Sequence, residues 1–318
     1  MSTPPLTMPP IPPPAAFEPA DFPPVRYHVL HETRHQYQRS VTLSQQMLHM
    51  TPRVFRWQQV LEHDIEVTPV PQEWAGQIDY FGNTSRSFTL TTPHRTLVVR
   101  GSATVALLRR PDAVHFASSP AWESTRAQMR LPGQALEPSK FLFESPHVTC
   151  SAELAQYAGP SFTSRRPLLE AAYDLTQRMY HDFEFDDEAT TISTPLHEVL
   201  IGRRGVCQDF AHLMFGCLRS LGLAARYVSG YILTTPPPGQ PRMVGADASH
   251  AWVSVYCSHA GWVDFDPTNR RLVQDEHITL GWGRDFSDVT PMRGTVLGGG
   301  AQSLEVSVTV TPLSGPAA

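Results

Sequence analysis

The chain has 318 residues, of which 41% are hydrophobic, and it carries a formal net charge of −5 at pH 7. This length allows a sizeable core and more than one domain. The acidic balance argues against a nucleic-acid-binding protein, because no basic surface is indicated. No apolar stretch is long enough for a membrane span, and the N-terminus lacks a signal-peptide pattern, so we expect no association with a membrane.

The chain contains four cysteines, at positions 150, 207, 217 and 257. They lack the dense spacing of a disulfide-stabilised secreted protein. We therefore expect a cytoplasmic protein.

Four parts of the chain differ in composition. Residues 1–24 are dense in proline and predict a disordered tail. From 25 to 110, short alternating strands separated by turn residues predict an all-β, sandwich-like domain. Residues 111–160 indicate a connector with one or two helices. Residues 161–318 predict a second domain of mixed α+β class, which ends in a half-buried strand with alternating apolar residues.

The most informative stretch of the second domain begins with Gly202 and Gly205 and continues with Cys207. Apolar residues then recur at intervals of three and four, which predicts a buried helix that ends at Gly222. Cys207 would lie in the first turn of this helix. The unpaired N–H groups and the positive dipole end of a helix favour a thiolate at that position.

Two segments rich in aromatic and β-branched residues follow, at 248–256 and 261–269, and both predict strands. A hairpin that turns at Ser258 would set His250 opposite Asp266. A base held by a carboxylate and facing a thiol is the arrangement of nucleophile, base and orienting acid used in covalent catalysis. Asp264, with the same strand parity, is the alternative acid.

These blocks carry a resemblance to a known family. In order and content they are similar to the motifs of the bacterial branch of the transglutaminase-like superfamily. The resemblance implies a papain-like core, in which a helix carrying the cysteine packs on an antiparallel sheet carrying the histidine and the aspartate. The segments that carry it are Tyr27–Tyr37, Asp79–Asn83, Gly205–His212, Ser249–Trp252, Gly261–Asn269 and Gly281–Asp285.

The resemblance also assigns roles. Cys207 matches the family's nucleophile, His250 its base, and Asp266 the aspartate that stands four residues after a tryptophan. It implies acyl transfer on peptide or protein amides through a thioester, without a cofactor. Two alternatives stay open. One is a cysteine protease or amidase that releases a small peptide or amide product, with partner enzymes of peptide-bond metabolism. The other is a non-catalytic scaffold with a vestigial triad.

The groups that would surround the triad are less defined. Many relatives carry a tyrosine in a segment upstream of the cysteine where this chain has Phe185, so a hydroxyl that could hold the oxyanion is missing. The Cys207 N–H would then act with a second donor, for which Gln208 is the candidate. Trp252 and Trp262 are candidate substrate contacts, and a proline-rich loop at 234–241 is a candidate rim of the cleft.

A zinc site is the competing hypothesis for the same helix, because Cys207, His212 and Cys217 are spaced by five residues. Five residues rotate by about 140° around a helix, so the three side chains would diverge. We therefore expect no metal site, with Cys217 in the core and His212 hydrogen-bonded behind the nucleophile.

Overall fold

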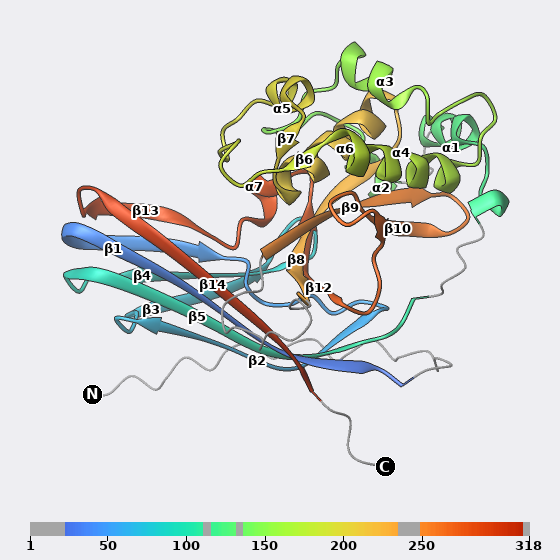
Figure 1. The fold of residues 1–318 in the computed structure, drawn as a ribbon. Coiled ribbons are helices and arrows are strands. Elements are labelled where there is room, and N and C mark those ends of the chain that lie inside the picture. Colours follow the sequence, from blue (N-terminus) through green and yellow to red (C-terminus); the bar gives the residue numbers. More distant parts are fainter. Residues whose placement is uncertain (1–22, 111–115, 132–135, 235–248, 314–318) are drawn as a thin grey trace, which may run out of the picture.

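The computed structural model describes residues 23–110, 116–131, 136–234 and 249–313. The predicted tail at 1–24 and the predicted cleft rim at 234–241 fall almost entirely outside these ranges. Figure 1 shows two layers of β-structure, with the helices gathered on the outer side of the smaller one.

The larger sheet has seven strands and is built around β1, a continuous strand of 24 residues at Val25–Leu48. The first half of β1 pairs with β5 and β14, and its second half pairs with β4 and β13. The sequence grouped the last strand with the second domain, whereas β14 pairs with β1. The other strands are β2 (Gln58–Thr68), β3 (Glu73–Ile78), β4 (Thr84–Leu90), β5 (His94–Leu107), β13 (Met292–Gly298) and β14 (Gln302–Leu313).

This sheet folds over itself around an apolar core, in keeping with the sandwich-like prediction. Val41 and Leu48 from β1, Val67 from β2, Phe88 from β4 and Leu97 from β5 are all buried in one cluster. The strand with alternating apolar residues at the C-terminus is half-buried over only part of its length. Its apolar residues at 308 and 310 are covered, but those at 304 and 306 are exposed, because the latter lie beyond the edge of the second domain.

The smaller sheet is antiparallel and has the strand order β11-β10-β9-β8-β12. One face carries α6 (Cys207–Ser220), whose buried residues pack on β8 and β9 together with α4 (Leu168–Asp182). The sequence predicted α6 to end at Gly222, two residues after its last helical residue. The strands are β8 (Ala225–Ile232), β9 (Ser249–Cys257), β10 (Gly261–Asp266), β11 (Arg271–Leu272) and β12 (His277–Gly283).

Short elements connect and cover these layers. Two of them, β6 (Glu184–Phe185) and β7 (Arg204–Gly205), form a small parallel pair just before α6. The remaining helices are α1 (Trp122–Met129), α2 (Leu136–Ser139), α3 (Ala152–Ala158), α5 (Leu196–Gly202) and α7 (Phe286–Val289), with a 3-10 turn at Phe116–Ser118.

Two amide side chains from the larger sheet and its loops form hydrogen bonds with backbone groups of the edge strand β12. Gln58 accepts the N–H of Thr279 at 2.8 Å and donates to the Thr279 carbonyl at 2.7 Å. Asn83 likewise accepts the N–H of Trp282 at 3.0 Å and donates to its carbonyl at 2.9 Å. Each amide therefore replaces one residue of a neighbouring strand, and the two layers are held in one register.

Gly281 has no side chain at the point where Asn83 approaches. A Cβ there would lie 2.7 Å from Asn83 Oδ1, and Asn83 is buried and held by hydrogen bonds to Asp79 and Arg53. We predict that Gly281→Ala lowers the free energy of unfolding by about 1–3 kcal/mol, because a packed contact must shift. Urea unfolding followed by tryptophan fluorescence measures the change.

Gly76→Ala is the matched control, because nothing lies within 4 Å of the Cβ that it would add on β3. We expect that variant to unfold within about 0.5 kcal/mol of the parent protein. Equal stabilities of the two variants would contradict the proposed role of the Asn83 contact.

Candidate active site

The start of α6 is fixed by the side chain of Asp209. Its Oδ2 accepts the N–H of Val206 at 2.9 Å and the hydroxyl of Thr190 at 2.6 Å. A Cβ on Gly205 would lie 2.6 Å from the same oxygen, so only glycine fits there. These contacts set the first turn of the helix, in which Cys207 is half-buried and remains accessible at the open end.

Phe185, which replaces the tyrosine of many relatives, and Gln208, the candidate second oxyanion donor, lie near this turn. Phe185 pairs with Gly205 through the short β6–β7 ladder, and its ring is 58% exposed. Gln208 is half-buried in the first turn of α6, directly after Cys207. Both residues therefore lie beside the nucleophile candidate, one on each side along the chain.

His250 and Asp266 come together from neighbouring strands. Their side chains meet with His250 Nε2 2.7 Å from Asp266 Oδ2. The predicted register is wrong by one residue at the turn. Cys257 pairs with Gly261, so the hairpin is centred on His259 and Asp266 lies diagonally across from His250. Diagonal neighbours on one face are still within reach of an imidazole, which is why the contact forms.

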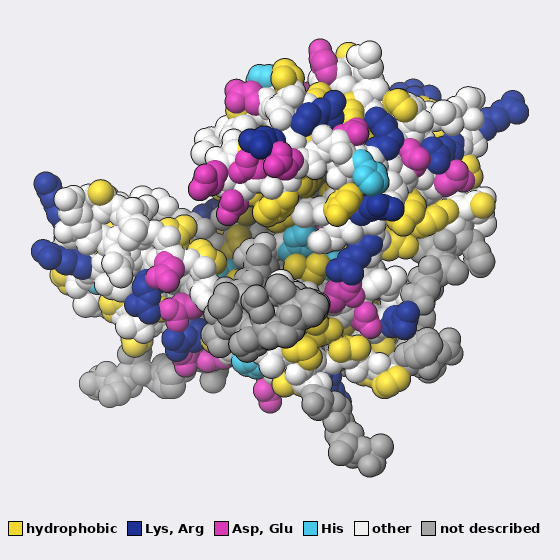
Figure 2. All heavy atoms as spheres, viewed as in Figure 1, with side chains coloured by type: hydrophobic (Ala, Val, Ile, Leu, Met, Phe, Trp, Pro, Cys, Tyr) yellow, Lys and Arg dark blue, Asp and Glu magenta, His cyan; other side chains and the backbone are white. Residues whose placement is uncertain are grey.

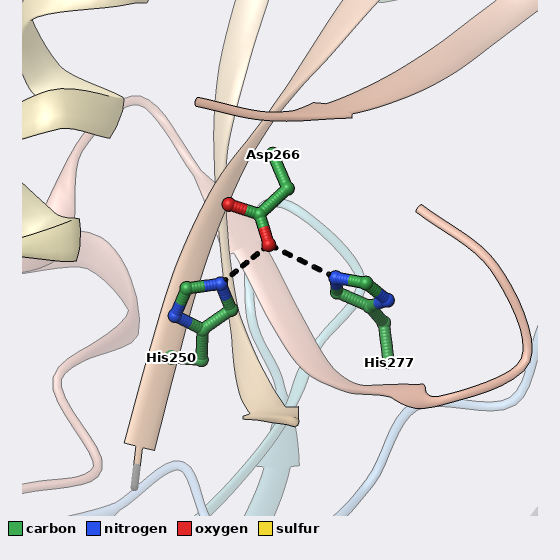
Figure 3. Close-up of side chains that lie close together, drawn as sticks. All are labelled: His250, Asp266 and His277. Carbon is green, nitrogen blue, oxygen red and sulfur yellow. Dashed lines mark hydrogen bonds and ion pairs between the residues drawn. The ribbon is translucent and has the colours of Figure 1, made fainter. Parts of the chain in front are cut away.

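Asp266 is completely buried and accepts hydrogen bonds from several donors. The backbone N–H groups of Thr268 and Asn269 donate to Oδ1 at 3.0 and 3.1 Å. The Asn269 side-chain amide donates to Oδ2 at 2.7 Å, and His277 Nε2 lies 3.1 Å from the same oxygen. Figure 3 shows this oxygen between the rings of His250 and His277. A buried carboxylate with this many donors is held ionised and fixed in position.

His277 was not predicted from the sequence. It is the first residue of β12, and its Nδ1 accepts the N–H of Gln274 at 3.4 Å. The proton of a neutral ring is therefore on Nε2, which donates to Asp266. A lone histidine at the start of an apolar strand is too common a pattern to have indicated this role.

The protonation states follow from these contacts. Burial opposes a charge on His250, but the carboxylate of Asp266 and an interaction with Cys207 prevail and raise the pKa of His250 to about 10. Burial alone would raise the pKa of Asp266, yet the two histidines hold it well below its usual range. Burial lowers the pKa of His277 and keeps that ring neutral.

Cys207 completes the arrangement on the other side of the imidazole. Its Sγ lies 4.0 Å from the carbonyl oxygen of Ser249, the residue before His250. Because Nε2 of His250 faces Asp266, Nδ1 is the nitrogen left for the thiol. The geometry can therefore support an ion pair between a thiolate and an imidazolium whose orientation is fixed by a carboxylate.

The imidazole and carboxylate groups at 250, 266 and 277 also suit a divalent cation, since their ligand atoms lie within 4.8 Å of one another. However, both Nε2 atoms contact the same carboxylate oxygen directly, so these groups are engaged in hydrogen bonds with each other. A cation would have to separate them.

Cys207, His212 and Cys217, the three ligands that the zinc hypothesis requires, have different surroundings. Cys217 is buried in the apolar core. His212 stacks on His147 and accepts the N–H of Phe286 at 3.2 Å. The latter contact lies behind α6, in line with the position expected for His212.

The remaining candidates lie away from Cys207 or in the core. Trp252 is completely buried and packs edge-to-face on His277, with ring centroids 5.3 Å apart. Trp262 is half-buried and stacks with Arg226. Asp264, the alternative acid, bonds to Arg110 at 2.6 Å. Trp252 also lies against the ring of His250, with centroids 6.1 Å apart, whereas the described contacts of Trp262 are with other residues and Asp264 is engaged by Arg110.

With this geometry in view, comparisons with known proteins identify the class. Residues 155–267 match the family model of the transglutaminase-like superfamily, and residues 27–106 match the bacterial transglutaminase-like N-terminal region. The chain belongs to the transglutaminase-like superfamily, and its core has that fold.

Several relatives are similar over nearly the whole chain. The uncharacterized protein Rv2569c of Mycobacterium tuberculosis is 41% identical over 300 residues, which cover 92% of this chain and 94% of that protein. The uncharacterized protein ML0607 of Mycobacterium leprae is 30% identical over 292 residues, or 91% and 99% of the two chains. A protein-glutamine gamma-glutamyltransferase of Pseudomonas aeruginosa is 36% identical over 80 residues, 25% of this chain and 12% of that one.

Among solved structures, a proposed cysteine protease from Cytophaga hutchinsonii superposes with a TM-score of 0.71 at 21% identity and covers 93% of each chain. This likeness establishes that the whole architecture, including the larger sheet, recurs in another protein. No helix within the described residues has both the length and the apolarity to cross a lipid bilayer.

The donor role of His277 can be isolated with two variants. His277→Leu and His277→Gln both remove the titrating imidazole, but only glutamine can still offer an N–H to Asp266. Because such a donor lowers the pKa of Asp266, its stabilising effect is present above the unfolded carboxylate pKa and is lost as the pH falls. We expect the leucine variant to unfold at a higher pH on acidification.

Acid titration followed by circular dichroism compares the two variants directly. Coincident acid transitions would show that the contact between residue 277 and Asp266 does not stabilise the carboxylate.

Proposed function

We propose that this protein is a thiol-dependent acyltransferase that acts on peptide or protein amides through a thioester. The observation that carries the proposal is the contact between His250 Nε2 and buried Asp266 at 2.7 Å, next to a cysteine in the first turn of a helix. Membership of the transglutaminase-like superfamily supports cysteine chemistry in general. Cys207, His250 and Asp266 are the proposed catalytic residues.

In the first half-reaction, the Cys207 thiolate attacks the carbonyl carbon of an amide, and the electron pair of the C=O bond moves onto oxygen. When the oxyanion collapses, the C–N bond breaks and His250 gives its Nδ1 proton to the leaving amine. A thioester and a neutral imidazole remain. Asp266 keeps Nε2 protonated and stabilises the charged ring before the proton is transferred.

In the second half-reaction, an acceptor amine attacks the thioester and loses a proton to His250, which releases the thiolate. Water can take the place of the amine, and the product is then a free acid. The N–H groups at the start of α6 would hold the oxyanion in both steps, with the Gln208 amide as the proposed second donor. Loss of one such donor typically costs about 3–4 kcal/mol of barrier lowering.

A protein amide as the acyl donor is supported by the local similarity to the glutamyltransferase of Pseudomonas aeruginosa. The hydrolytic alternative is supported by the fold shared with the proposed protease of Cytophaga hutchinsonii. A vestigial scaffold is disfavoured, because a core without a function for Asp266 would gain nothing from burying a carboxylate among two histidines. All four cysteines are unpaired, which is in line with the proposed cytoplasmic location.

The proposed ion pair predicts how Cys207 reacts with iodoacetamide. The reaction rate of an ordinary thiol falls about tenfold for each pH unit below its pKa, because the thiolate fraction falls. We expect Cys207 to react rapidly at pH 6 with a much flatter pH profile. Asp266→Asn should restore a steep profile, because it removes the carboxylate that raises the pKa of His250. Mass spectrometry of labelled peptides measures each site.

The other cysteines serve as internal controls. Cys217 and Cys257 are completely buried, and burial raises the pKa of the half-buried Cys150. We expect little labelling of these three at pH 6. If Cys207 reacted no faster than Cys150, the catalytic hypothesis would be rejected in favour of the scaffold.

Transfer and hydrolysis are separated by their products. With a glutamine-containing peptide, a transferase releases ammonia and incorporates an added primary amine, whereas a hydrolase releases ammonia and leaves glutamate. We expect amine incorporation, and a loss of at least about 10²-fold in rate for His250→Asn, since the acid–base step is removed. Ammonia release with no incorporated amine at saturating amine would support the hydrolase alternative.

A further inference from the structure

A cavity lies beside β10 and β11 of the smaller sheet. Its volume is about 780 Å³, and it is lined by β8, β10 and the hairpin turn between β9 and β10, together with the loop at 55–57. Cavities of roughly 300–1,000 Å³ commonly hold small organic ligands. The turn at His259–Gly261 belongs to this lining, whereas Cys207 lies beside Ser249 at the opposite end of β9. That nine-residue strand spans roughly 25 Å at about 3.3 Å per residue, so the turn end of the cavity is far from Cys207. The other end approaches Asp266 from behind, because Gln274 also lines the cavity and donates its N–H to His277.

The wall of this cavity contains a buried arginine with an unfilled hydrogen-bonding position. The Arg226 side chain is 7% exposed and lies between two indole rings, 4.1 Å from Trp262 and 3.7 Å from Trp282. Its carboxylate neighbour Glu137 is 3.8 Å away and is mostly exposed. Within the described part of the chain, Arg226 Nε has no hydrogen-bond partner. A buried donor without a partner is costly, so this N–H is available to a ligand that enters the cavity.

Arginines and carboxylates both line the cavity. Arg56, Arg110 and Arg226 line the cavity, against the carboxylates of Asp264 and Glu137. Asp264 is taken up by Arg110 at 2.6 Å. Burial, together with the neighbouring positive charges of Arg110 and Arg53, outweighs the two carboxylates and lowers the pKa of Arg226 to about 9. Arg226 nevertheless keeps its positive charge at pH 7, so it can pair with an anion.

The residues that line the cavity also indicate which other chemical groups a ligand would carry. Gln274 lines the cavity, and its Oε1 is a buried acceptor that none of the described residues satisfies. Aromatic rings from Phe55, Trp57, Trp262 and Trp282 supply apolar surface. The cavity thus combines a cationic donor, a neutral acceptor and flat apolar walls.

We propose that this cavity binds a small organic carboxylate with an aromatic group and an N–H donor, the chemistry of an N-acylated aromatic amino acid. The carboxylate pairs with Arg226, the N–H meets the Gln274 oxygen, and the ring packs on the tryptophans. Cys207 does not line this cavity, so binding there requires no reaction at the thiol.

The test uses full-length protein carrying Cys207→Ala, so that no reaction at the triad contributes. Isothermal titration calorimetry compares N-acetyl-L-phenylalanine with the neutral N-acetyl-L-phenylalaninamide, which has the same ring and N–H but no carboxylate. We expect the acid to bind at least tenfold more tightly than the amide, and Arg226→Gln to abolish this difference.

A second pair of variants keeps the test decisive if Arg226→Gln fails to fold. Ala260 lines the exposed rim of the cavity, and Ala260→Trp should reduce binding at least tenfold by filling the entrance. Ala75→Trp, on the exposed strand β3, is the matched control and should bind like the parent protein. Equal affinities for acid and amide, no binding at millimolar ligand, or unchanged binding by Ala260→Trp would each overturn the proposal.

Discussion

The proposed site depends on one buried carboxylate. Asp266 has no solvent to stabilise its charge, so the protein supplies donors from three places: the backbone after β10, the Asn269 amide and the imidazoles of His250 and His277. These donors keep Asp266 ionised, and the ionised carboxylate keeps His250 protonated on Nε2. The orientation of the base towards Cys207 therefore follows from how the carboxylate is buried.

Local patterns in the sequence predicted the parts of this site that are close in the chain. The glycines before Cys207 and the apolar period of three and four defined α6 almost to the residue. The pairing of His250 with Asp266 followed from two strands joined by a short turn, although the turn is centred one residue later than expected. Motif resemblance was what distinguished Asp266 from Asp264, since parity alone could not.

Contacts between distant segments were not predictable in the same way. His277 joins the site because β12 crosses the sheet beside β8, and nothing in its own neighbourhood indicates that pairing. Trp252 has the composition of a substrate contact, but the same alternation that faces it away from α6 buries it beneath His277. The final strand returns to β1, a pairing over more than 250 residues of sequence that no local pattern specifies.

The hydrogen bonds of Gln58 and Asn83 with β12 connect the larger sheet to the proposed active site. The superfamily match ends at residue 267, before β12 begins, so neither His277 nor the backbone groups that Gln58 grips belong to the matched core. Gln58 fixes Thr279, which is two residues from His277, and His277 supports Asp266. The larger sheet is therefore a structural support of the proposed active site: a fragment cut at the family boundary would lack His277, one of the donors that keep Asp266 charged.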